Sequence, residues 1–140
     1  MNPGFTAPGP GESGIQRLVV GAAIERDGRV LAARRSAPAA LSGGWEFPGG
    51  KLEPGETPAA ALARECAEEL GVRVAVGALL AETPIRDGLT LAVYRARLVA
   101  GEPRALQDHD ELRWLGRAEL DDVDWLAPDR PAVALLRELL

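Results

Sequence analysis

Three glutamates near the middle of the chain stand at a spacing that suits metal-ion chemistry. At about 100° per residue, Glu65, Glu68 and Glu69 fall within one arc of a helix. Carboxylates crowded on one helical stripe repel each other unless a positive charge lies between them. Mg²⁺ prefers carboxylate oxygens and keeps bound water for a phosphate-bearing substrate, so the stripe predicts a magnesium site. A helix with a merely solvated acidic face is the alternative interpretation.

The helix that must position these carboxylates is well marked in the sequence. Thr57 suits the N-cap, Pro58 suits the first helical position, and Gly71 suits the left-handed residue that closes a helix. We therefore expect a helix over residues 58–70. The apolar residues on the adjacent arc are expected to face a core: Ala59, Leu62, Cys66 and Leu70.

The same stretch resembles the Nudix box in full. That pattern is a glycine, five residues, a glutamate, seven residues, Arg-Glu, an apolar residue, one residue, Glu-Glu, one residue, a glycine and an aliphatic residue. Its positions are filled here by Gly50, Glu56, Arg64-Glu65, Cys66, Glu68-Glu69, Gly71 and Val72. Cys66 is the one soft departure, and a buried thiol behaves as a small apolar residue. A solvated acidic helix does not account for the loop glycine, Glu56 and the arginine together.

The resemblance implies a role for each charged residue of the box. Glu65, Glu68 and Glu69 would bind Mg²⁺, or Mn²⁺ as a substitute, together with the backbone carbonyl of Gly50. Glu65 is the first candidate for the general base, and Glu68 is the alternative. Two further residues would hold the ligands in place from behind: Glu56 and Arg64.

A further carboxylate often joins the metal site from a late loop in this family. Counted back from Trp114, Asp108 fits that position best, and Asp110 or Glu111 is the alternative. His109 is the only histidine of the chain, and a lone loop histidine more often has no direct catalytic role.

The residues expected at the substrate come from before and after the box. In MutT-type members of the family, the arginine matching Arg35 contacts the nucleotide, and the residues matching 46–49 wall the base pocket. Arg35 could instead be an exposed strand end, and Phe47 could equally belong to the core. Lys51 could reach a phosphate, or it could be a solvated loop lysine. Asp129 falls where the base is read, although it is also suited to the N-cap of a final helix. The full set is Arg35, Glu46, Phe47, Pro48, Gly49, Lys51 and Asp129.

The substrate implied by the resemblance is a (deoxy)nucleoside triphosphate, cleaved to the monophosphate and pyrophosphate. Residues 121–131 look like a MutT subgroup that hydrolyses CTP and 5-methyl-dCTP, with some members accepting 8-oxo-dGTP. An ionised Asp129 only accepts hydrogen bonds, so it would prefer a base edge with N–H donors. Two alternatives stay open, namely a hydrolase of ADP-ribose or another nucleoside-diphosphate conjugate, and a non-catalytic nucleotide sensor.

Composition bounds the class of protein. The 140 residues, 46% hydrophobic and 26% charged, are enough for one domain over residues 15–140 after a disordered tail at residues 1–14. A net charge of −5 disfavours binding to a nucleic-acid polymer. The sequence has no apolar run of membrane-spanning length and no basic, apolar secretory leader. One cysteine fits a reducing compartment, so we expect a cytoplasmic protein. A monomer or weak homodimer is expected.

The remaining elements predict an α/β (α+β) protein with a mixed sheet. The order is β-β-β-α-β-β-β-α, which resembles the α/β/α sandwich of the Nudix fold. A glycine turn is expected at residues 49–50, a polar loop at 101–110, and a helical turn at 118–120. Strands are expected at residues 18–24, 30–35, 45–47, 73–82, 89–99 and 112–115, and a C-terminal helix at 131–140.

Overall fold

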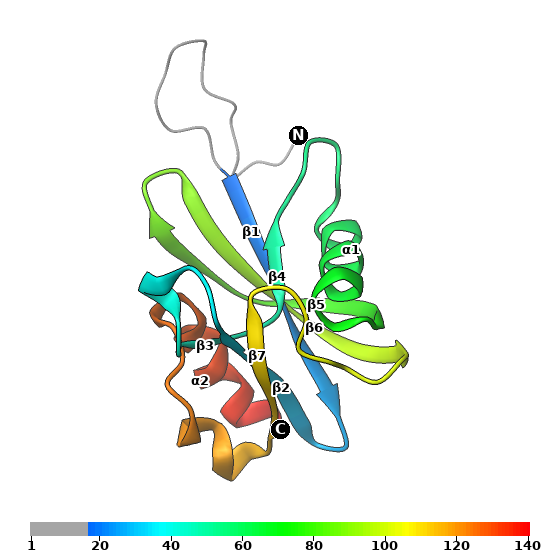
Figure 1. The fold of residues 1–140 in the computed structure, drawn as a ribbon, viewed down its shortest axis with the longest axis vertical. Coiled ribbons are helices and arrows are strands. Elements are labelled where there is room, and N and C mark those ends of the chain that lie inside the picture. The colour runs from blue at the N-terminus through cyan, green and yellow to red at the C-terminus, as the bar shows by residue number, and fades with distance from the viewer. Residues whose placement is uncertain (1–16) are drawn as a thin grey trace.

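The computed structural model describes residues 17–140, so the predicted disordered tail at 1–14 lies outside the described residues (Figure 1). The strands are β1 (Arg17–Arg26), β2 (Arg29–Arg35), β3 (Trp45–Glu46), β4 (Gly49–Lys51), β5 (Arg73–Arg86), β6 (Leu89–Ala100) and β7 (His109–Leu115). The helices are α1 (Pro58–Leu70) and α2 (Arg130–Leu139), and 3-10 turns cover Ala39–Leu41, Arg117–Asp122 and Ala127–Asp129.

The strands form one mixed sheet, as predicted. The main order is β3-β2-β1-β6-β5, with β1 and β6 parallel and the other neighbours antiparallel. Strand β4 pairs with β1, and β7 pairs with β2. The apolar run of β1 is buried from Val20 to Ile24 because this strand lies in the middle of the sheet.

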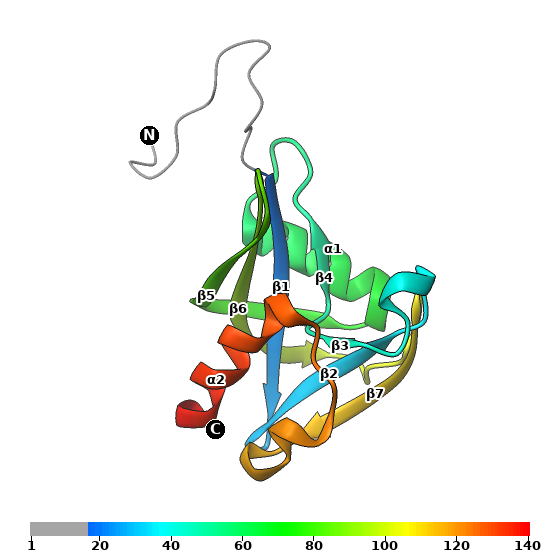
Figure 2. The same ribbon diagram turned by 90° about the vertical axis from the view of Figure 1, so that its left-hand side faces the viewer.

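Two apolar clusters lie on opposite faces of this sheet. Alternate residues of β1 enter different clusters, with Ala22 beside α1 and Ala23 beside α2. Figure 2 shows α1 and α2 on opposite sides of β1, so the predicted α/β/α sandwich is confirmed. None of the helices in residues 17–140 is both long and apolar enough to cross a membrane.

The predicted boundaries of α1 are confirmed. The Oγ1 atom of Thr57 accepts a hydrogen bond from the Ala60 N–H at 3.1 Å, Pro58 opens the helix, and Gly71 closes it with φ of 71°. The prediction for Ala59 is wrong, because this residue is exposed and Ala61 is buried instead.

The inward face of α1 is also rotated relative to the prediction. Glu69 lies within about 20° of Leu62 around the helix axis. It therefore falls in the middle of the core-facing arc, and it is buried with 8% of its surface exposed. The acids do not form a solvated stripe beside the core; Glu69 is part of the inner face.

Three other boundaries differ from the sequence prediction. Residues 49–50 form a strand rather than a turn, because glycine lets this backbone approach β1: a Cβ on Gly49 would lie 1.8 Å from the Val20 carbonyl oxygen. Strand β5 continues to Arg86 through irregular pairing with β6. The late loop is shorter than expected, since His109 pairs with Arg35 and already belongs to β7.

Candidate active site

Arg64 links the acidic residues around α1. Its Nε and Nη2 atoms donate to the two carboxylate oxygens of Glu56 at 2.9 and 3.0 Å. Its Nη1 atom donates to Glu65 at 3.1 Å and to Glu68 at 3.4 Å. Nη2 also donates to the Lys51 carbonyl at 3.1 Å, so one guanidinium joins the loop, β4 and the helix.

Glu56 is the most strongly held of these carboxylates. The forked hydrogen bond from Arg64 and a backbone N–H from Glu53 lower the pKa of Glu56 to about 2. Glu56 therefore stays ionised and fixes Arg64. This geometry supports the prediction that the two residues position the metal ligands rather than bind the metal.

Glu65 and Glu69 meet the glycines of β4. A Cβ on Gly50 would lie 2.2 Å from Glu65 Oε2, so only glycine lets this carboxylate rest against the strand. Oε1 of Glu69 accepts the Gly49 N–H at 3.1 Å. Burial raises the pKa of both carboxyl groups, to about 8 for Glu69.

The donor chemistry of this region suits a hard divalent cation. Glu65, Glu68 and Glu69 supply only carboxylate oxygens, and the backbone of Gly50 lies directly beside Glu65. Within residues 17–140, however, no three acidic, histidine or cysteine side chains converge closely enough to hold an ion. Glu68 lies on Arg64 instead, with 46% of its side chain exposed, and must leave the guanidinium to bind metal with the other two.

The structure does not bring the late-loop carboxylates to these acids. Asp108 is exposed in a turn with φ of 55°, directly before β7. Asp110 and Glu111, the alternatives, both pair with Arg34, at 2.7 and 3.1 Å. A ligand role for Asp108 therefore stays a prediction.

A second group of polar residues is buried around β3, among the residues that the resemblance assigns to the base. Asp129 has 5% of its surface exposed, and its Oδ1 accepts the Phe47 N–H at 3.1 Å. Burial, and to a lesser extent the charge of Glu46, raises the pKa of Asp129 to about 8. Asp129 stands at the start of α2, but its side chain caps nothing there. Asp129 and Phe47, both predicted at the substrate, are therefore in direct contact.

Glu46 contacts one residue from each of two other strands, β2 and β7. Its Oε2 atom lies 3.2 Å from Arg35 Nη1 and 2.8 Å from His109 Nε2. The rest of the Arg35 guanidinium donates to the Ala37 carbonyl, so this predicted substrate contact is largely engaged within the protein. Lys51 is exposed, and Pro48 is fully buried.

Sequence reasoning gave His109 little weight and missed Trp125. The His109 side chain is wholly buried against Glu46, a contact between residues 63 positions apart that no local pattern announces. The Trp125 ring packs on Phe47 with 4.7 Å between centroids. The one signal for Trp125 was an aromatic residue within the polar segment before α2.

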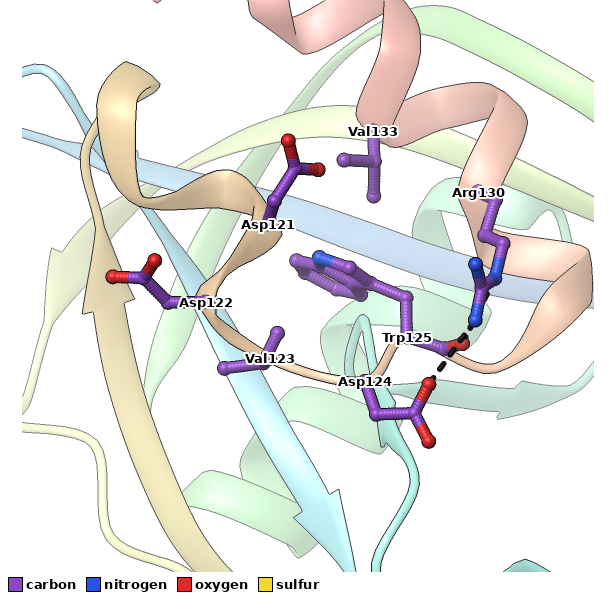
Figure 3. Close-up of a pocket in the computed structure, with 7 residues that line it drawn as sticks. All are labelled: Asp121, Asp122, Val123, Asp124, Trp125, Arg130 and Val133. Atoms are coloured by element: carbon purple, nitrogen blue, oxygen red, sulfur yellow. Dashed lines mark hydrogen bonds and ion pairs between the residues drawn. The ribbon is translucent and has the colours of Figure 1, made fainter.

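A separate cavity of about 530 Å³ lies beside Trp125 (Figure 3). It is open to solvent, and the Asp124–Arg130 ion pair of 3.1 Å borders it. None of the predicted substrate residues lines it. Its walls are Asp121, Asp122, Val123, Asp124, Trp125, Arg130 and Val133.

Comparisons with known proteins find similar sequences and structures over most of the chain. The family model described as NUDIX domain matches residues 15–138. A Mycobacterium tuberculosis protein named as a candidate 8-oxo-dGTP diphosphatase is 48% identical over 130 residues, covering 90% of this chain and 92% of the relative. The CTP pyrophosphohydrolase of Escherichia coli is 52% identical over 63 residues, 45% of this chain and 47% of the relative.

Among solved structures, a MutT NUDIX hydrolase from Burkholderia pseudomallei superposes with a TM-score of 0.76 at 32% identity. The match covers 86% of this chain and 97% of that one. The similarity therefore extends over the whole sandwich and is not confined to the acidic helix.

Proposed function

The chain belongs to the Nudix hydrolase family, and from this premise we propose that it hydrolyses a (deoxy)nucleoside triphosphate to the monophosphate and pyrophosphate. The observation that carries the proposal is the contact between Glu65 and Glu69 of α1 and the glycine backbone of β4. This contact puts two carboxylates against β4, and β4 directly follows Glu46 and Phe47, which are predicted to contact the base. The names of the relatives favour a role in cleansing or balancing the nucleotide pool.

Glu65, Glu68, Glu69 and the Gly50 carbonyl are the residues that would hold the divalent metal ion, Mg²⁺ or Mn²⁺. When bound, such an ion neutralises phosphate charge and lowers the pKa of water. Glu65 is our candidate for the general base, with Glu68 as the alternative. Burial raises the pKa of Glu65 above its ordinary value, which makes its carboxylate a better proton acceptor.

Arg64 and Glu56 would act by position. The guanidinium already joins Glu56, Glu65 and Glu68, so it can keep Glu65 oriented while Glu68 turns towards the metal. The late-loop ligand, Asp108, would have to come from its exposed turn.

The base would lie against Phe47 and be read by Asp129. With a pKa of about 8, Asp129 is largely protonated at neutral pH, so it can donate a hydrogen bond as well as accept one. This revises the expectation of a purely accepting carboxylate. Together with an accepting Glu46, Asp129 offers a donor–acceptor pair, and cytosine presents its N4 amino group next to its N3 acceptor. 8-Oxoguanine also presents donors and acceptors side by side.

The proposal extends to the setting of the protein. We take residues 15–140 as the hydrolase domain, acting on free nucleotides and not on a nucleic-acid polymer. The net charge of −5 supports the last point. A cytoplasmic monomer or weak homodimer is the form that we propose.

A nucleotide panel tests the proposed function. Phosphate release is measured with Mg²⁺ and added pyrophosphatase for CTP, 5-methyl-dCTP, 8-oxo-dGTP, the common triphosphates and ADP-ribose. We expect release that requires pyrophosphatase, with a cytosine or 8-oxoguanine nucleotide preferred. Preference for ADP-ribose, followed by its own products, would support the conjugate hydrolase instead. Binding without turnover would support the nucleotide sensor.

A further inference from the structure

The two oxygens of Glu46 have different surroundings. Oε2 accepts from both Arg35 and His109, at 3.2 and 2.8 Å. Oε1 has no hydrogen-bond partner among residues 17–140, and it is not a sealed atom, since the side chain keeps 17% exposure. Oε2 is thus held by protein side chains, whereas Oε1 can accept a hydrogen bond from a bound ligand.

His109 is placed in a way that a purely structural residue would not need. Its side chain is wholly buried, and within the described part of the chain its Nδ1 is the one buried side-chain polar atom without a hydrogen-bond partner. A buried polar atom without a partner costs stability, and an apolar residue would fill the same space without that cost. The one interaction that an apolar residue could not provide in this place is the contact of His109 Nε2 with Glu46.

Glu46 needs this support because its carboxylate is partly buried. Its charge raises the pKa of both Asp129 and Glu69, so each of these carboxyl groups lies within electrostatic reach of Glu46. Without donors on Oε2, the Glu46 carboxylate would lose its hydrogen bonds and would be better solvated if it turned towards water. Arg35 and His109 come from the paired strands β2 and β7, which gives the anchor a rigid base.

We propose that His109 is a positioning residue for base selection: with Arg35 it holds Oε2 of Glu46, so that Oε1 is presented to the nucleobase. The inference rests on the proposed function, because it assumes that the base lies beside Phe47 and Asp129. His109 touches neither substrate nor metal in this arrangement. It acts through Glu46.

Amide substitutions give a matched kinetic test. In His109→Gln the amide can reach the position of Nε2 and donate to Glu46, whereas in His109→Asn it ends near the position of Nδ1 and cannot. We expect His109→Asn to raise KM roughly tenfold for the preferred nucleotide among CTP, 5-methyl-dCTP and 8-oxo-dGTP. Its kcat and Mg²⁺ requirement should stay near wild type, and selectivity over ATP should fall. His109→Gln should restore most of the selectivity.

A control separates positioning from general loosening of the strand. Leu115→Ala removes a fully buried side chain at the other end of β7 and should lower thermal stability without changing selectivity. If the wild type is selective and His109→Asn keeps the same nucleotide preference, the inference is overturned and the proposed function stands. An equal loss of selectivity in Leu115→Ala would also overturn it. A wild type that hydrolyses no triphosphate would remove the proposed function itself.

A second measurement needs no substrate. Because His109 is the only histidine, untagged protein labelled with ¹⁵N-histidine gives one pair of imidazole signals. We expect a proton on Nε2 that exchanges slowly with water, and we expect its signal to shift in Glu46→Gln but not in Leu115→Ala. A rapidly exchanging Nε2 proton, or no response to Glu46→Gln, would overturn the inference whatever the nucleotide panel shows.

Discussion

The metal side and the base side of the candidate site are built in different ways. The metal side consists of β4, α1 and the loop between them, and its acids come from residues 49–72 apart from the predicted late-loop ligand Asp108. The base side consists of Arg35, Glu46, Phe47, His109, Trp125 and Asp129, which come from four separate parts of the chain. The short segment from β3 to β4 joins the two.

The two sides also manage their charges differently. On the metal side, Arg64 pairs with three partly exposed carboxylates, and only the buried Glu69 tends towards its neutral form. On the base side, Asp129 is deeply buried and tends towards its neutral form. A charged, adaptable region suits an ion and a polyphosphate, whereas a dry region with fixed hydrogen bonds suits discrimination between bases. The two functions should therefore separate under mutation.

The largest effect should come from Glu68→Gln or Glu69→Gln. Each replaces a carboxylate ligand of the proposed metal site with a weaker amide ligand, so we expect kcat to fall roughly a hundredfold or more with every nucleotide. The fold should survive, since Glu68 is exposed and the buried Glu69, with a pKa of about 8, is already largely neutral at pH 7. Steady-state kinetics and circular dichroism check both points. Retained turnover in the folded variants would remove the box from the mechanism.

Asp129→Ala should act on the base side alone. We expect selectivity between bases to fall, with KM for the preferred nucleotide rising roughly tenfold, because a buried hydrogen-bonding group is lost. The Mg²⁺ concentration needed for half-maximal activity should not change. An equal loss for every nucleotide in the panel would mean that Asp129 does not read the base.

The sequence predicts the helix of the metal side well because the information for it is local. Helix caps, the glycine positions and the spacing of Glu65, Glu68 and Glu69 all lie within one short stretch, and α1 has the predicted bounds. The degree of burial was not predictable in the same way. Glu69 is part of the inner face because β4 runs beside it and offers the Gly49 N–H, and that strand was expected to be a turn.

The base side could be predicted only in part, because it depends on long-range pairing. Residues 46–49 and Asp129 were assigned by resemblance, but the contact of Phe47 with Asp129 joins positions 82 residues apart. His109 was assigned to a loop, and it enters the site because β7 pairs with β2. Periodicity and spacing carry no information on such contacts.

The pH dependence of stability gives a smaller, separate measure of the base side. The pKa of Asp129 is about 8 in the folded protein and lies near its ordinary value of 3.8 when unfolded. The folded state therefore binds more protons between these values, and its stability falls as pH rises from about 4 to about 8. One such group lowers the free energy of unfolding by up to about 1.4 kcal/mol per pH unit.

Asp129→Asn removes this titration. We expect urea unfolding of the metal-free protein to show a flatter decline in stability from pH 5 to pH 8 than the wild type shows. Glu82→Gln, an exchange of the same kind at a site distant in sequence from the active site, should keep the wild-type slope. An unchanged slope in Asp129→Asn would mean that its carboxyl group is already ionised across this range.

The smallest effect is expected at the cavity beside Trp125, which borders the base side without sharing its predicted residues. Asp124→Ala breaks the ion pair with Arg130. The Asp124 side chain is 85% exposed and the Arg130 side chain is 61% exposed. Exposed pairs contribute little, so the free energy of unfolding should change by less than about 0.5 kcal/mol. Nucleotide selectivity should stay at the wild-type value, because Trp125 meets Phe47 with its ring and not through Asp124. A change in selectivity would instead mean that the base site includes this cavity as well as Trp125.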